Sequence, residues 1–130
     1  MNRRTALLAA SAFFLSACGA SGPPPPPPWS AAGLFSFTTQ VPDLGTIVGS
    51  MAITEEGGTY GGMVEVEGGM LPPMAISSIE VGDRTIEIQA DFQGETLFME
   101  MTFTTNDEYT GFWTVQGESG EISGSRIGSP

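Results

Sequence analysis

Residues 85–92 read TIEIQADF and residues 96–104 read TLFMEMTFT, and these two segments decide the fold. In the first, apolar residues occupy positions 86, 88, 90 and 92, with polar residues between them. In the second, apolar residues occupy positions 97, 99, 101 and 103. This period of two is that of a half-buried β-strand, and Gln93-Gly94 between the segments is a turn signal. The sequence therefore predicts a β-hairpin here.

The same pattern extends over most of the chain. Residues 47–53 alternate in the same way, and turn signals rich in glycine, aspartate and asparagine separate the apolar runs. We expect strands near 34–39, 46–54, 59–67, 74–79, 84–92, 96–104, 109–115 and 121–127. Eight short strands joined by short turns indicate an all-β antiparallel meander. Closure into a small barrel would remove exposed edges, and a two-sheet β-sandwich is the alternative.

A weak internal repeat supports the hairpin assignment. Residues 51–68 resemble residues 101–117, and each copy has a glycine, Gly62 or Gly111, two residues after a tyrosine. Glycine inside a strand commonly marks a bulge or the close approach of a neighbour. The hairpin register predicts that Gly111 lies opposite Met101 and that Trp113 lies opposite Met99.

The N-terminal segment carries a different signal. Arg3 and Arg4 precede an apolar run, which ends in Leu15-Ser16-Ala17-Cys18 with the one cysteine of the chain. This stretch resembles the lipobox of bacterial lipoprotein precursors, although a buried N-terminal helix with a free thiol is the alternative. The resemblance implies a signal peptide over 1–17 and fatty-acyl chains, such as palmitate, on Cys18. It implies a protein of the cell envelope that is held to the membrane by these chains.

The remaining organisation follows from this assignment. Residues 18–32 contain the lipidated cysteine and a proline-rich tether, in which six consecutive prolines form a stiff polyproline II spacer. Residues 33–130 form the β-domain. Gly19 stands where an aspartate would retain many lipoproteins at the inner membrane, so by this resemblance the outer membrane, facing the periplasm or the exterior, is favoured.

Composition excludes several functions. The chain has no histidine and no lysine, and loss of the leader would leave only Arg84 and Arg126 against fifteen acidic residues. Nucleic-acid binding needs clustered basic residues, so we expect none. Triads with histidine, Schiff-base chemistry and the usual zinc sites are also excluded. We expect no enzymatic activity, no cofactor and no specific metal site, and a carboxylate-based hydrolase is the alternative.

Two groups of residues are candidates for binding. The inward face of the predicted strands 96–104 and 109–115 carries Leu97, Met99, Met101 and Trp113, which would line a cavity if the barrel is hollow. Core filling explains the two methionines better than a copper site does. The opposite faces carry a second group, which would form a partner surface if its members were contiguous. This group consists of Met63, Phe98 and Phe112.

Arg126 on the last strand and Trp29 before the first are loosely similar to a pair in lipocalin-like barrels, where an arginine near the end packs over a tryptophan near the start. The resemblance implies no binding residues for this chain. We expect a non-catalytic β-domain that acts in binding or structure, through a protein partner or as a carrier of a small apolar ligand.

Overall fold

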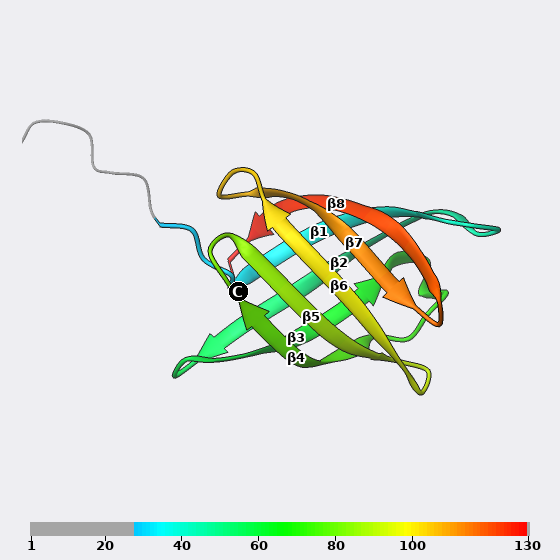
Figure 1. The fold of residues 1–130 in the computed structure, drawn as a ribbon, viewed down its shortest axis with the longest axis horizontal. Helices are drawn as coiled ribbons and strands as arrows, with labels where there is room; N and C mark the ends of the chain where they lie inside the picture. Colours follow the sequence, from blue (N-terminus) through cyan, green and yellow to red (C-terminus); the bar gives the residue numbers. More distant parts are fainter. Residues whose placement is uncertain (1–27, 130) are drawn as a thin grey trace, which may run out of the picture.

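Eight β-strands follow one another along the chain in the computed structural model, which describes residues 28–129 (Figure 1). The strands are β1 (Gly33–Val41), β2 (Gly45–Glu56), β3 (Thr59–Val66), β4 (Met74–Val81), β5 (Thr85–Phe92), β6 (Glu95–Phe103), β7 (Glu108–Val115) and β8 (Glu118–Gly128). A short 3-10 helix, η2 (Glu67–Gly69), follows β3. The leader, Cys18 and the spacer up to residue 27 lie outside the described residues.

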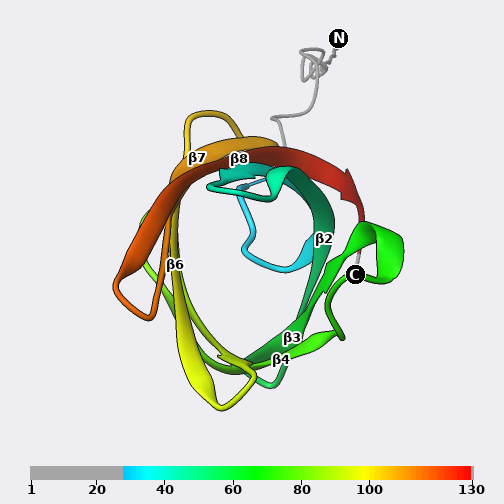
Figure 2. The same ribbon diagram turned by 90° about the vertical axis from the view of Figure 1, so that its right-hand side faces the viewer.

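The sheet closes on itself. Each strand pairs antiparallel with the next, and β1 also pairs with β8, where Thr39 lies opposite Ile122. The predicted all-β meander and closed barrel are confirmed, and the β1–β8 pairing rules out the two-sheet sandwich. Figure 2 shows the ring of strands from one end.

The strand assignments are confirmed, with small differences at the ends. The largest difference is in β8, which begins at Glu118 rather than near residue 121. The cause is a tight turn, because Gln116 and Gly117 have φ values of 51° and 80°. Positive φ at both central residues is the geometry of a type I′ hairpin turn, which needs only two residues between strands.

The repeated hairpins are β2–β3 and β6–β7. The predicted register of the second is confirmed, with Gly111 opposite Met101 and Trp113 opposite Met99. Gly62 lies opposite Ile53 in the first hairpin. A Cβ atom on Gly111 would lie 2.8 Å from the carbonyl carbon of Glu100, so a side chain there would collide with the next strand. Inward-facing glycine thus allows the sheet to bend tightly enough to close.

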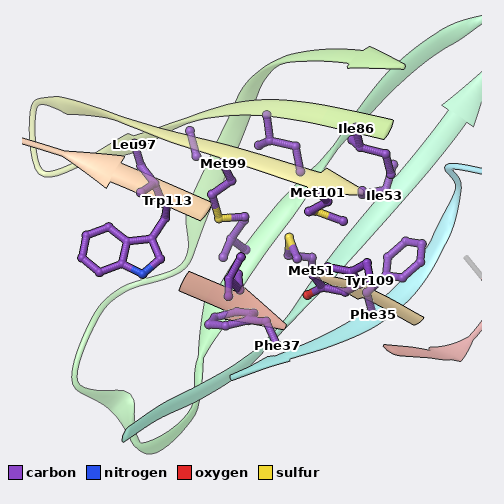
Figure 3. Close-up of a cluster of buried hydrophobic side chains, with 14 of the residues drawn as sticks. Phe35, Phe37, Met51, Ile53, Ile86, Leu97, Met99, Met101, Tyr109 and Trp113 are labelled. Atoms are coloured by element: carbon purple, nitrogen blue, oxygen red, sulfur yellow. The ribbon is translucent and has the colours of Figure 1, made fainter. Parts of the chain in front are cut away.

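Alternation places one face of every strand in the barrel interior, which side chains from all eight strands fill. Figure 3 shows that Phe35 and Tyr109 lie toward one end of this core, and that Leu97 and Trp113 lie toward the other. Met51 and Met101 lie between them and are fully buried. Their flexible thioethers fill the middle of the barrel. The two ends are therefore packed by different residues.

Candidate binding site

One end of the barrel is closed by aromatic side chains. The segment before β1 folds across this end, where Ala31 is buried and the Trp29 ring lies 5.3 Å from that of Phe103 (left-hand end of Figure 1). The Phe103 ring also lies 5.5 Å from Phe35 and 5.3 Å from Tyr109. Contacts of this kind between tilted rings stabilise a core beyond the area that they bury.

Arg126 fixes the crossing segment in place. Its guanidinium donates to the carbonyl oxygens of Ala32 at 2.7 Å and Ser30 at 2.6 Å, and its Nε lies 3.2 Å from a carboxylate oxygen of Asp107. The guanidinium carbon lies 4.7 Å above the centre of the Phe35 ring. The similarity to lipocalin-like barrels is therefore limited, because the ring beneath the arginine is Phe35. Arg126 holds Trp29 only indirectly, by binding the carbonyl oxygens of the nearby residues Ser30 and Ala32.

Tyr109 closes the gap between β1 and β7 at this end. Its hydroxyl donates to the carbonyl oxygen of Ser36 at 2.7 Å. Burial raises the pKa of the Tyr109 hydroxyl well above its ordinary value. The buried phenol is therefore a neutral, hydrogen-bonded part of the closed end, and its environment opposes ionisation.

The other end contains a pocket of about 480 Å³ that is partly open to solvent. Its floor consists of interior side chains, among them Val64, Leu97 and Trp113. Its rim consists of the connections that meet at this end, which faces the viewer in Figure 2. Leu44 in the β1–β2 turn and Met70 after η2 line the pocket while more than half of each side chain is exposed. Apolar surface thus continues from the interior onto the rim.

A hydrogen-bonded pair forms the polar part of the pocket wall. The indole N–H of Trp113 donates to the hydroxyl of Thr39 at 2.7 Å, and that hydroxyl donates to the carbonyl oxygen of Glu121 at 2.6 Å. Gly120 lies opposite Trp113 on β8, and a Cβ atom there would lie 2.7 Å from three atoms of the indole ring. The glycine provides the space in which the indole lies, and the threonine fixes its orientation.

The structure separates the residues that the sequence suggested as a cavity lining. Leu97, Met99 and Trp113 line the pocket. Met101 lies two residues beyond Met99 on β6, opposite Gly111, where it is fully buried and is not among the lining residues. The sequence reasoning did not identify Thr39, Leu44 or Met70. The signal available for Thr39 was a polar residue at an inward position of β1. Leu44 and Met70 lie in connections between strands, where no periodicity could have predicted their position.

The suggested partner surface is also divided. Phe98 and Phe112 are diagonal neighbours on the outer face of β6 and β7, and about half of each side chain is exposed. Met63 lies on β3, which β4 and β5 separate from β6. The structure therefore brings the two phenylalanines together and places the methionine elsewhere.

Within residues 28–129, no three or more histidine, cysteine, aspartate or glutamate side chains are grouped so that they could hold a metal ion. The helical structure in this part of the chain includes no segment that is long and apolar enough to cross a membrane.

Comparison with known proteins identifies a similar fold. No protein-family model and no curated protein matches the chain. Among solved structures, a redesigned β-barrel is similar, with a TM-score of 0.54 and 12% sequence identity. The match covers 74% of this chain and 90% of the designed one. At this identity the likeness shows the fold alone: a small closed β-barrel.

Proposed function

We propose that this chain is a lipid-anchored lipoprotein of the cell envelope whose non-catalytic β-barrel binds a small apolar ligand at its open end. The observation that carries the proposal is the pocket of about 480 Å³, which is floored by apolar side chains and lies at the end of the barrel opposite to the aromatic cluster. Sites for small molecules are concave, mostly apolar cavities of roughly 300–1,000 Å³ with few polar groups. A barrel of eight strands is wide enough to hold one such ligand.

The position of the tether is compatible with this role. The described chain enters the barrel at the closed end, where Trp29 packs on Phe103. An anchor on Cys18 would then hold the protein by the end opposite to the pocket, and the tether would leave the mouth free. Two or three acyl chains are sufficient for stable attachment, because each buried methylene contributes about 0.8 kcal/mol.

Metabolic labelling with radioactive palmitate tests the anchor. We expect label in the wild-type protein and none in a Cys18→Ala variant, with the wild-type protein sedimenting with outer membranes. Equal labelling of the two proteins, or no labelling of the wild type, would contradict this part of the proposal.

Binding is tested with N-phenyl-1-naphthylamine, a neutral apolar probe whose fluorescence rises in apolar surroundings. Val115 lines the pocket, whereas its neighbour Thr114 points outward from β7. We expect saturable binding to the wild type and to Thr114→Trp, and at least tenfold weaker binding to Val115→Trp, in which the indole occupies the mouth. If both variants bind as the wild type does, the probe is not in the pocket.

A protein partner is the second candidate, because Phe98 and Phe112 form a small exposed aromatic patch. A photo-crosslinking amino acid at position 98 would then give a discrete cross-linked product in cells. The same amino acid at Thr54, which is exposed on the outer face of β2, is the control. Identical patterns from the two positions would argue against a partner at the patch.

A further inference from the structure

The basic side chains of the barrel lie at one of its two ends, whereas acidic side chains occur at both. Within residues 28–129 the basic side chains are Arg84 and Arg126, and both belong to the closed end. Arg126 binds the segment that crosses this end, and the carbonyl oxygen of Arg84 accepts a hydrogen bond from the backbone N–H of Phe103 at 2.8 Å. The described chain therefore places no basic side chain at the mouth of the pocket.

Every connection at the open end either contains an acidic residue or is followed directly by one. Asp43 in the β1–β2 turn and Glu118 at the β7–β8 turn line the pocket itself. Glu67 lies in η2, and Glu95 follows the β5–β6 turn. A low-dielectric cavity surrounded by charges of one sign concentrates ligands of the opposite sign at its entrance. The mouth thus attracts cations and repels anions.

Among the described residues, the interior wall of the pocket offers no positively charged partner to a negative head group. The indole N–H of Trp113 and the hydroxyl of Thr39 are hydrogen-bonded to each other, and the Thr39 hydroxyl also binds the Glu121 carbonyl. A carboxylate or sulfate that entered the pocket would lose its hydration without gaining a charged partner, which is strongly unfavourable. An alkyl or aromatic group has no such requirement and can fill the space beside Leu97.

We infer that the ligand of this pocket is a small cationic amphiphile, with its apolar part among the interior side chains and its positive head at the acidic rim. The inference rests on the proposed binding function and specifies the class of ligand. Complementarity between the rim and the head gives the selectivity, and burial of the tail gives most of the affinity. Leu44 and Met70 extend the apolar contact to the rim, where the head emerges.

The test compares three amphiphiles with the same twelve-carbon tail, each below its micelle concentration: dodecyltrimethylammonium, dodecyl maltoside and dodecanoate. The protein is the whole chain with Cys18→Ser, so that no acyl chain competes, and with Trp29→Phe. Trp113, in the pocket, is then the one tryptophan left, and its fluorescence reports binding. At low salt we expect dodecyltrimethylammonium to bind about tenfold more tightly than dodecanoate, with dodecyl maltoside between them and with the difference shrinking at high salt.

Matched charge variants locate the effect. The double variant Asp43→Asn/Glu118→Gln removes rim charges, and we expect its preference for the cation to fall about threefold. Glu55→Gln/Glu56→Gln removes the same charge from the closed-end side of β2, and we expect the preference to be retained.

The possible outcomes distinguish a wrong ligand class from a wrong binding function. If the three amphiphiles bind equally, or if dodecanoate binds most tightly, the cationic ligand is wrong and the binding function stands. If both charge variants behave alike, the rim does not select the ligand. If none of the amphiphiles changes Trp113 fluorescence and the naphthylamine probe also fails to bind, both are wrong.

Discussion

Trp113 donates its indole N–H to the hydroxyl of Thr39 across the floor of the barrel, at a distance of 2.7 Å. Both side chains are buried, and the two residues lie 74 positions apart in the sequence. In the barrel, β8 lies between β7 and β1, and the bond joins these two strands across it. The bond fixes Trp113, the largest side chain that lines the pocket. The shape of the pocket therefore depends on this contact.

Replacement of Thr39 by valine tests that dependence. Valine keeps the volume of the side chain but leaves the buried Trp113 N–H without a partner. We expect the free energy of unfolding to fall by about 1–3 kcal/mol, the usual cost of an unsatisfied buried group. Thr39→Ser keeps the hydroxyl and should cost clearly less in the same urea titration. A valine variant as stable as the serine variant would show that the bond contributes little.

Gly120 should tolerate no side chain, because a Cβ atom would lie 2.7 Å from the Trp113 ring. We expect Gly120→Ala to displace the indole into the pocket, to cost about 1–3 kcal/mol, and to weaken binding of the naphthylamine probe. Gly61→Ala is the control, because the nearest atom to its added Cβ would be 4.0 Å away. Gly61→Ala should be neutral or slightly stabilising. Equal stability of the two alanine variants in thermal unfolding would contradict this account of Gly120.

Arg126 should be required in its exact chemical form at the closed end. Lysine keeps the positive charge but cannot reach the carbonyl oxygens of Ser30 and Ala32 with a planar fork. We therefore expect Arg126→Lys to lower the free energy of unfolding by about 1–2 kcal/mol. Arg84→Lys changes an exposed turn residue in the same way and should have almost no effect. Denaturant titrations that give the two lysine variants equal stability would show that the fork is dispensable.

Tyr109 makes stability sensitive to alkaline pH. Burial raises the pKa of its hydroxyl in the folded protein, whereas a tyrosine in the unfolded chain ionises near pH 10. Above that pH the unfolded state has lost a proton that the folded state keeps, so stability falls as pH rises. This group contributes at most about 1.4 kcal/mol per pH unit.

Thermal unfolding between neutral pH and strongly alkaline pH measures this slope. Tyr109→Phe should be less stable at neutral pH, because the bond to Ser36 is lost, but its stability should decline less above pH 10. Burial and the neighbouring Glu55 also raise the pKa of Tyr60, so Tyr60→Phe should reduce the decline too, but less than Tyr109→Phe does. Parallel curves for all three proteins would mean that Tyr109 does not cause the alkaline loss.

The sequence was sufficient to predict the strands and the closed barrel, because alternation and glycine-rich turns are local signals. The alternation in residues 85–104 predicted two of the strands, and the register of the next hairpin predicted the pairs Gly111–Met101 and Trp113–Met99. The predicted start of β8 was wrong, because Gln116-Gly117 was not taken as a turn, although it is the same dipeptide as Gln93-Gly94 and has the same positive φ at both residues. The local pattern could therefore predict where strands lie but not every turn that joins them.

The site was predicted only in part, for a different reason. Alternation shows that Met99 and Met101 both point inward, but their depth in the barrel depends on strands that are distant in sequence. The contacts of Arg126 with Ser30 and Ala32 span 96 and 94 positions, so no local pattern reveals them. The division between a closed and an open end follows from such contacts.

The most direct test of the central claim uses the two tryptophans, which lie at opposite ends of the barrel. In the nitrogen-15 NMR spectrum of the whole Cys18→Ser chain, each indole N–H gives its own signal. Addition of N-phenyl-1-naphthylamine should shift the Trp113 signal in a saturable way and leave the Trp29 signal in place. A shift confined to Trp29, or no shift of either signal, would contradict binding at the open end.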